Sequence, residues 1–299
     1  MDLFGQLQDL MIKHHFRPEK KLSQFFCVNE ALLQFLVNSA RIEKGDVIIE
    51  VGPGTGFLTR KLLDKAKKVE AKVIAIDVDE TMIDLLKIEF EEDIQKGHLE
   101  LICTNTLTAD FNALGATKIV ALPPYHISSD LVTKIAMTKG IKKSILVLDK
   151  GFVEKLVAFE GFSEYVALTV LVNLNSKVEV LESNISPQSF FPSPNCQSSV
   201  VQMEFNVKNN SSDFFTFLRE LFRHKNKDLG KSLKQSFMFL SQELNWSEKD
   251  FIKNLKTLKL TKKKVYILTP QEFLGVFEHF NDNQTKTSKK PVKKSAKID

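Results

Sequence analysis

Residues 47–56 read Val-Ile-Ile-Glu-Val-Gly-Pro-Gly-Thr-Gly, and this stretch decides the fold class of the chain. Its first half, residues 47–51, is a short apolar run with the composition of a buried strand. Three glycines follow at alternate positions, and a helical pattern of apolar side chains begins directly after them at Phe57. A strand that turns through glycines into a helix lets a ligand approach bare backbone at a helix N-terminus. The stretch therefore predicts an α/β domain with a ligand site at this turn.

The spacing of the glycines separates two classes of nucleotide-binding domain. Gly52, Gly54 and Gly56 alternate, whereas the dinucleotide-binding fingerprint has the spacing G-x-G-x-x-G. With Glu50 they form Glu-x-Gly-x-Gly-x-Gly, which resembles the first motif of S-adenosylmethionine-dependent methyltransferases. The alternative is a structural turn in another kind of nucleotide-binding α/β domain.

Short apolar strands alternate with amphipathic helices through the first half of the chain. This alternation predicts an α/β fold with a doubly wound, mostly parallel sheet, whose ligands lie beyond the carboxyl ends of the strands. The apolar run at residues 166–174 is predicted as either a sixth strand or a helix. The other five strands are predicted at residues 47–51, 72–76, 99–103, 118–121 and 144–148.

The remaining patterns predict four segments. Residues 1–20 mix charged and apolar side chains and are expected to form a loose arm with a short helix. Residues 21–205 hold the α/β domain. From residue 206 the spacing of apolar side chains becomes helical, which predicts a small all-helical domain over 206–280. Residues 281–299 are rich in Lys, Ser and Thr, lack aromatics and are predicted to be a disordered basic tail.

Net charge is concentrated in this tail. The chain carries +5, and six lysines against two aspartates place +4 of it in residues 281–299, so the folded body is close to neutral. A phosphate-binding arm and a solvated tail without a role are both compatible with this composition.

Composition also indicates the cellular compartment of the protein and the kinds of partner that it lacks. No apolar run reaches the ~18 residues of a membrane helix, and the N-terminus lacks a secretory signal pattern. The three cysteines are odd in number and far apart, which indicates a reducing compartment and no zinc site. We therefore expect a cytoplasmic protein without a membrane or metal partner.

Polar residues close two of the predicted strands. Asp77 ends the strand that follows the glycine loop, where a carboxylate accepts hydrogen bonds from vicinal ribose hydroxyls; a helix-capping Asp is the alternative. Asn105 follows the third strand, where its amide matches an adenine edge, and a turn-forming Asn is equally compatible. Val78 and Thr106 adjoin these two positions.

A second motif, Leu122-Pro123-Pro124-Tyr125, follows the fourth strand. Two prolines fix the backbone and leave carbonyls without competing N–H groups, and Tyr125 presents a ring that can stack on a base. The segment resembles the Asn/Asp-Pro-Pro-Tyr or Asn-Leu-Pro-Tyr motif of amino-methyltransferases that act on adenine or glutamine. In those enzymes an amide or carboxylate and a proline carbonyl accept hydrogen bonds from the substrate amino group.

Further motifs extend the resemblance along nearly the whole chain. With the glycine loop they occur in the order and at the spacing of the KsgA/Dim1 family of ribosomal RNA adenine N6,N6-dimethyltransferases. The segments that are similar to family motifs are residues 20–26, 120–129, 190–201 and 222–229.

The resemblance implies a class I, Rossmann-like methyltransferase that uses S-adenosylmethionine on two adjacent adenosines near the 3′ end of small-subunit rRNA. The expected partner is this rRNA or a pre-ribosomal particle, and the chain is expected to be monomeric. The implied cofactor contacts are Gln24, Phe25, Glu50, Gly52, Gly54, Gly56, Asp77, Val78, Asn105 and Thr106.

Substrate contacts are implied in three places. Residues 122–125 would hold the target adenine, and Phe190 and Phe191 would lie beside the mouth of the active site, where a flipped base needs a partner. A basic segment of the predicted helical domain would contact RNA phosphates, with a solvated helix as the alternative. Its residues are Arg223, Lys225 and Lys227.

The residues that depart from the family pattern lie at or next to positions where the resemblance implies cofactor or substrate contacts. Ser23 stands for Gly, Phe25 for Asn or His, Asn105 for Asp, and Leu122 for the substrate-facing Asn. They motivate a second hypothesis, a catalytically weakened or inactive relative that acts as an RNA-binding ribosome-assembly factor. A small-molecule methyltransferase fits the glycine loop but not the basic helical domain.

Overall fold

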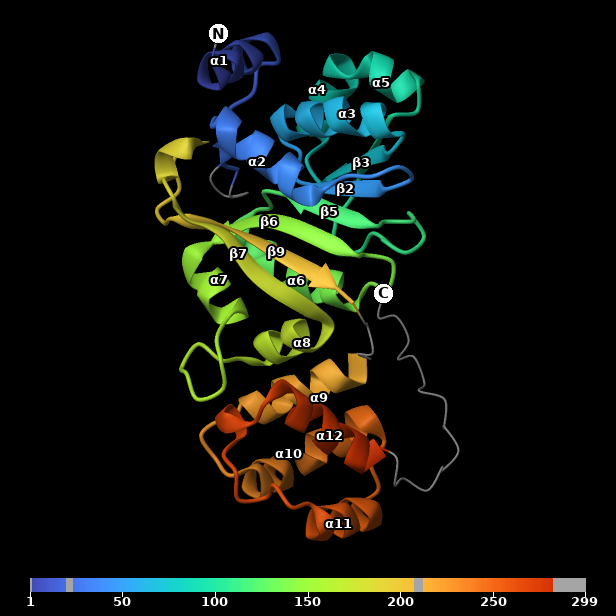
Figure 1. Cartoon of the computed structure of the whole chain (residues 1–299), viewed down its shortest axis with the longest axis vertical. Coiled ribbons are helices and arrows are strands. Elements are labelled where there is room, and N and C mark those ends of the chain that lie inside the picture. The colour runs from blue at the N-terminus through green and yellow to red at the C-terminus, as the bar shows by residue number, and fades with distance from the viewer. Residues whose placement is uncertain (1, 20–23, 207–211, 282–299) are drawn as a thin grey trace, which may run out of the picture. The chain divides into compact units, whose positions relative to one another are not determined.

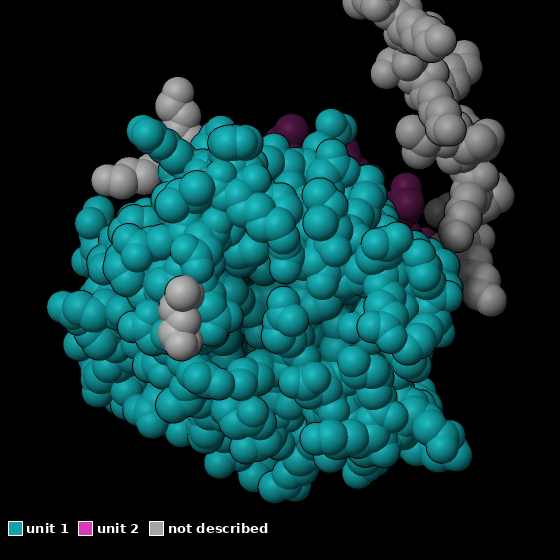
Figure 2. Space-filling view, turned by 90° about the horizontal axis from the view of Figure 1, so that it is seen from above, with its two compact units in different colours: residues 1–215 teal, residues 216–299 magenta. Residues whose placement is uncertain are grey.

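The computed structural model describes residues 2–19, 24–206 and 212–281 (Figure 1). The chain divides into two compact units, residues 1–215 and 216–299, which Figure 2 colours teal and magenta. This division falls inside the helix Ser212–Phe222. All but the first residue of the predicted tail, and residues 20–23 of the first family motif, lie outside the described residues.

A seven-stranded sheet in the order β4-β3-β2-β5-β6-β9-β7 forms the centre of the first unit. The five strands predicted from the sequence are parallel, which confirms the predicted α/β class: β2 (Val47–Val51), β3 (Lys72–Asp77), β4 (Leu99–Cys103), β5 (Lys118–Ala121) and β6 (Lys143–Asp149). Two strands that the sequence did not predict complete the sheet antiparallel to their neighbours, β7 (Ser176–Ile185) and β9 (Ser198–Phe205). A separate two-stranded sheet pairs β1 (Phe26–Cys27) with β8 (Phe190–Phe191).

Helices cover both faces of this sheet, so the unit has three layers (Figure 1). One face carries α2 (Glu30–Ala40), α3 (Phe57–Val69), α4 (Glu80–Glu89) and α5 (Glu91–Gln95). The other carries α6 (Ser128–Met137), α7 (Lys150–Leu156) and α8 (Ala167–Asn175), and α8 settles the ambiguous run at residues 166–174 as a helix. The parallel strands β2, β3, β5 and β6 are almost wholly buried because both of their faces are covered, whereas the edge strand β4 is only partly buried.

The N-terminal segment contains the short helix expected for it, α1 (Leu3–Lys13), and this helix is packed against the core. Asp2 caps this helix, since its Oδ1 accepts a hydrogen bond from the Gly5 N–H at 2.8 Å. Leu3 and Leu7 are buried in the main core cluster, and the Phe4 ring meets the edge of Phe191 at 5.3 Å. The apolar face of the helix therefore has a partner in β8, which is distant in sequence and could not be read from local pattern.

The second unit is a small helical bundle, which confirms the expected helical region. Its helices are α9 (Ser212–Phe222, which begins before the division), α10 (Leu229–Leu244), α11 (Glu248–Thr257) and α12 (Pro270–Asn281), with a 3₁₀ turn η4 (Val265–Ile267). Aromatic rings fill its core: Trp246 stacks on Phe280 at 5.0 Å, and Phe237 lies 4.4 Å from Phe251. Residues 223–227, expected on a helix, form the turn between α9 and α10. In the described ranges, no helix has the length and apolar character needed to cross a bilayer.

Candidate active site

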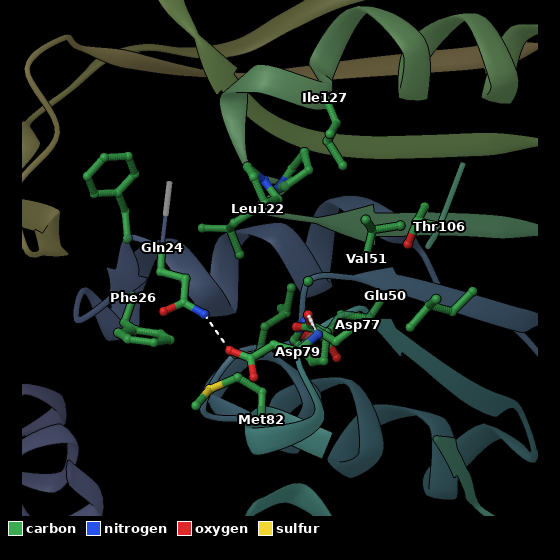
Figure 3. Close-up of a pocket in the computed structure, with 18 of the residues that line it drawn as sticks. Gln24, Phe26, Glu50, Val51, Asp77, Asp79, Met82, Thr106, Leu122 and Ile127 are labelled. Carbon is green, nitrogen blue, oxygen red and sulfur yellow. Dashed lines mark hydrogen bonds between the residues drawn. The ribbon is translucent and has the colours of Figure 1, made fainter. Parts of the chain in front are cut away.

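One cavity lies at the carboxyl ends of the parallel strands, where the strand order reverses between β2 and β5. Figure 3 shows Leu122 and Ile127 on one side of it and Asp79 and Met82 on the opposite side. The loops that follow β2, β3, β4 and β5 all contribute to its wall. Fourteen of the predicted site residues line it: Gln24, Phe25, Glu50, Gly52, Gly54, Asp77, Val78, Asn105, Thr106, Leu122, Pro123, Pro124, Tyr125 and Phe190.

Two predicted site residues of the first unit do not line this cavity. Gly56 begins α3 with a φ of +82°, and a Cβ there would lie 2.5 Å from the Phe90 ring, so this glycine serves packing. Phe191 pairs with Phe26 across the β1–β8 sheet and packs against Phe4. The three predicted RNA contacts, Arg223, Lys225 and Lys227, belong to the second unit.

The glycine loop presents bare backbone to the cavity. Gly52 and Gly54 have φ values of +68° and +54°, a region that favours glycine. The Gly52 N–H donates to the Ile76 carbonyl at 3.0 Å, which ties the start of the loop to β3. A Cβ on Gly54 would lie 2.9 Å from the Phe26 ring. Phe26, which was not among the predicted site residues, thus closes the loop from the side.

Asp77 is an acceptor held by backbone donors at the edge of the cavity. Burial is the main cause that raises the pKa of its carboxyl group, and the Asp79 charge adds to it, whereas the N–H groups of Asp79, Val78 and Gly54 lower it. The Asp79 N–H donates to Asp77 Oδ1 at 3.0 Å. The helix cap of α4 is Asp79, whose Oδ1 accepts from the Thr81 N–H at 2.9 Å. The Asp77 carboxyl group therefore does not cap this helix.

Asp79 also holds Gln24 across the cavity. The Gln24 Nε2 donates to Asp79 Oδ2 at 2.7 Å, as the dashed line in Figure 3 shows, and the Glu19 N–H donates to Gln24 Oε1 at 2.8 Å. Asp79 therefore does more than cap α4. Its second oxygen finds a partner 55 residues earlier, which only the folded chain reveals.

Glu50 is a buried carboxyl group at the base of the site. The Thr59 hydroxyl donates to its Oε2 at 2.7 Å. Burial raises the pKa of Glu50 to about 8; the Thr59 hydrogen bond opposes this rise, and the nearby Asp77 charge adds to it. Below that pH the group is neutral, which avoids two adjacent carboxylate charges in the wall of the cavity.

Asn105 forms a turn, which is one of the two roles considered for it. Its Oδ1 accepts from the Leu107 N–H at 2.9 Å, and its carbonyl accepts from the Thr108 N–H at 2.9 Å, so it closes a turn. The residue nevertheless lies in the cavity wall with Thr106 and Leu107.

The segment after β5 carries the second motif to the opposite wall. Leu122 is half-buried and packs against the core cluster, and a 3₁₀ turn, η2 (Tyr125–Ile127), follows the two prolines. The Tyr125 hydroxyl is 2.6 Å from the Ser198 Oγ at the start of β9, and its ring centre is 5.9 Å from that of Phe25. Burial raises the pKa of Tyr125 to about 12, so the phenol stays protonated.

Comparisons with known proteins agree with this geometry. The ribosomal RNA adenine dimethylase family matches residues 15–273. The probable ribosomal RNA small subunit methyltransferase A of Methanopyrus kandleri is 34% identical over 229 residues, which cover 75% of this chain and 79% of that protein. The corresponding protein of Methanothermobacter thermautotrophicus is 27% identical over 280 residues, covering 94% and 97%.

A solved structure shows the same likeness in three dimensions. The crystal structure of a dimethyladenosine transferase from Plasmodium falciparum superimposes with a TM-score of 0.72 at 28% identity, covering 86% of this chain and 98% of that one. The fold and the cavity define a class I methyltransferase. The chain belongs to the ribosomal RNA adenine dimethylase family. Among the described residues, no group of His, Cys, Asp and Glu side chains could hold a metal ion.

Proposed function

We propose that this chain uses S-adenosylmethionine to dimethylate N6 of two adjacent adenosines near the 3′ end of small-subunit rRNA. One observation carries the proposal. In a member of the adenine dimethylase family, a single cavity joins the bare glycine loop and Asp77 to the Pro-Pro-Tyr segment. Such a cavity holds a nucleoside and a planar base next to each other, which a transfer between them requires.

The residues present fit the cofactor. Gly52 and Gly54 place backbone without side chains in the cavity wall, and Asp77 offers carboxylate oxygens to two neighbouring ribose hydroxyls. Phe25, Phe26 and Tyr125 supply aromatic rings, whose faces favour a sulfonium cation. When bound, the cofactor supplies an electrophilic methyl group, so that the protein needs mainly to align and desolvate the attacking nitrogen.

The second motif holds the target adenine. The Pro123 carbonyl, held in a fixed backbone, accepts a hydrogen bond from the N6 amino group, and the Tyr125 ring offers a stacking surface. Ser198 fixes that ring through the 2.6 Å contact with its hydroxyl. Leu122 has no acceptor to offer at the position where the family has Asn. Alignment of N6 then rests on the Pro123 carbonyl and the Tyr125 ring, and the displaced amino proton leaves to water.

A basic hollow on the second unit provides a phosphate-binding surface for the RNA. Lys227, Lys231 and Lys234 gather around it together with Asn226, Gln235 and one acidic residue, Asp228. The Asp228 Oδ2 lies 3.6 Å from the Lys231 Nζ, so it offsets part of this positive charge. The Lys227 Nζ donates to Gln235 Oε1 at 2.6 Å, and this hydrogen bond fixes the position of the Lys227 ammonium group. Arg223 and Lys225 lie in the same turn and extend the basic segment. Clustered cations of this kind contact RNA backbone without reading its sequence.

Transfer of a labelled methyl group to an unmethylated small-subunit particle tests the proposal. Wild type should label adenine N6, and Tyr125→Ala should abolish the labelling. Calorimetry should show cofactor binding that Asp77→Ala loses and that Asp64→Ala, which changes an exposed carboxylate on α3, keeps. Equal affinity of wild type and Asp77→Ala would remove Asp77 from the site.

The leucine at position 122 supports one alternative function, in which the chain acts as an assembly factor on the same particle. Loss of a polar acceptor removes an orienting hydrogen bond, and Phe25 packs against the ring that would stack on the base. A wild type that binds the particle tightly and transfers no methyl group under any condition would support this alternative.

A further inference from the structure

The ammonium group of Lys134, on α6, donates to backbone carbonyls of a neighbouring loop. Its Nζ donates to the Leu107 carbonyl at 2.9 Å and also to the Ala109 carbonyl. The same Nζ lies 4.6 Å from the centre of the buried Phe111 ring. Among the ion pairs of the described residues, none involves Lys134, so its ammonium group is directed to backbone carbonyls and an aromatic face.

The carbonyls that Lys134 holds belong to the loop between β4 and β5, which forms one wall of the cavity. Asn105, Thr106 and Leu107 line that wall directly. The turn of this loop is closed by hydrogen bonds between near neighbours, such as the Leu107 N–H to Asn105 Oδ1. Such bonds shape the turn without fixing its position, whereas Lys134 joins it to a helix that packs on the sheet.

Physical chemistry makes this contact strong. Hydrogen bonds from a charged donor are shorter and roughly twice as strong as neutral ones. Lys134 is partly buried, and burial lowers its pKa, while the charge of Asp110 opposes that change. Loss of the ammonium group would leave two carbonyls of the loop without their donor and free the wall to shift.

We infer that Lys134 is a positioning residue that fixes the Asn105–Leu107 wall and thereby sets the affinity for the adenosine half of the cofactor. The inference rests on the proposed function, because it takes the cofactor to occupy this cavity. Lys134 itself is not among the residues of the cavity wall, so its effect passes through the loop.

Two substitutions of Lys134 and one control separate this role from a general effect on folding. Lys134→Met keeps the apolar stem and removes the cation, and Lys134→Arg restores a cationic donor. Lys139→Met removes an exposed cation just beyond the end of the same helix. Calorimetry of the full chain with S-adenosylmethionine, well below the melting temperature, should show about tenfold weaker binding for Lys134→Met, because the cavity wall loses its anchor. Lys134→Arg should recover most of the affinity, and Lys139→Met should match wild type.

Amide hydrogen exchange gives a readout that needs no cofactor. Lys134→Met should speed exchange in residues 105–111 and leave RNA affinity unchanged. Unchanged exchange in this loop, or cofactor affinity equal to wild type, would overturn the inference. A wild type that fails to bind the cofactor, while Lys134→Met still loosens the loop, would instead sink the proposed function and leave the positioning role standing.

Discussion

Glu50 should make the stability of the chain depend on pH in a direction unusual for a carboxyl group. Its pKa is raised to about 8 in the folded chain, against 4.5 as the ordinary value, so the native state binds the extra proton between these pH values. Stability must then fall as the pH rises through this window. Above pH 8 the folded chain carries a buried charge whose cost is on the order of a few kcal/mol.

Glu50→Gln removes this charge and retains an acceptor for the Thr59 hydroxyl. We expect the variant to be more stable than wild type at pH 9 and to lose that advantage by pH 5. Denaturant unfolding at several pH values measures the difference. Parallel stability curves for the two proteins would show that Glu50 does not carry the raised pKa.

Leu122 gives a prediction about rate. If Pro123 alone orients the target amino group, Leu122→Asn restores a second acceptor, and one orienting hydrogen bond of about 1.4 kcal/mol gives roughly a tenfold faster transfer. Leu122→Ala removes the leucine without adding an acceptor and serves as the control. Single-turnover labelling of the particle measures both variants. Equal rates for Leu122→Asn and Leu122→Ala would mean that position 122 does not meet the amino group.

At the scale of the elements, α1 offers a test of whether the N-terminal segment is part of the fold. Leu7 is fully buried and Ile12 is 72% exposed on the same helix. Leu7→Ala should cost about 2–5 kcal/mol, as for other large-to-small changes in a core. Ile12→Ala should stay within about 0.5 kcal/mol. Urea unfolding measures both, and equal small costs would indicate that α1 is detached in solution.

Sequence pattern predicted the parallel strands because burial on both faces produces continuous apolar runs that are visible locally. It did not predict β7, whose residues 176–185 are mostly polar and exposed, because pairing with β9 defines this strand more than its composition does. The run at residues 166–174 stayed ambiguous since a buried helix and a buried strand share the same apolar content. Only the fold showed that it is α8.

Sequence pattern likewise predicted one part of the candidate site and missed another. Motif residues such as Asp77 and Tyr125 follow strand ends, so topology alone brings them to one edge of the sheet. Their supporting partners do not follow from spacing: Ser198 and Lys134 act across tertiary contacts. Gly56 fits the motif, yet its neighbour is the Phe90 ring of the core.

At the scale of the whole molecule, charge placement predicts how the chain meets RNA. Residues 281–299 hold most of the net charge. Deleting them should make RNA affinity depend less steeply on salt, by about one unit of the logarithmic slope for each lysine that contacts a phosphate. The modified nucleotide should stay the same. Filter binding between low and physiological salt checks this, and an unchanged slope would mean that the tail does not contact RNA.

The position of β9 has a consequence for how the protein is made. This strand enters the sheet beside β6, although β6 ends at residue 149 and β9 ends at residue 205. At roughly 5–20 residues per second, a nascent chain leaves the backbone edge of β6 unpaired for about 3–11 seconds. An unpaired edge of this kind is a hazard for aggregation, so chains whose translation stops before residue 198 should need chaperones to stay dispersed. Ser198 arrives with β9, and the Tyr125 hydroxyl therefore gains its hydrogen-bond partner among the last events of synthesis of the first unit.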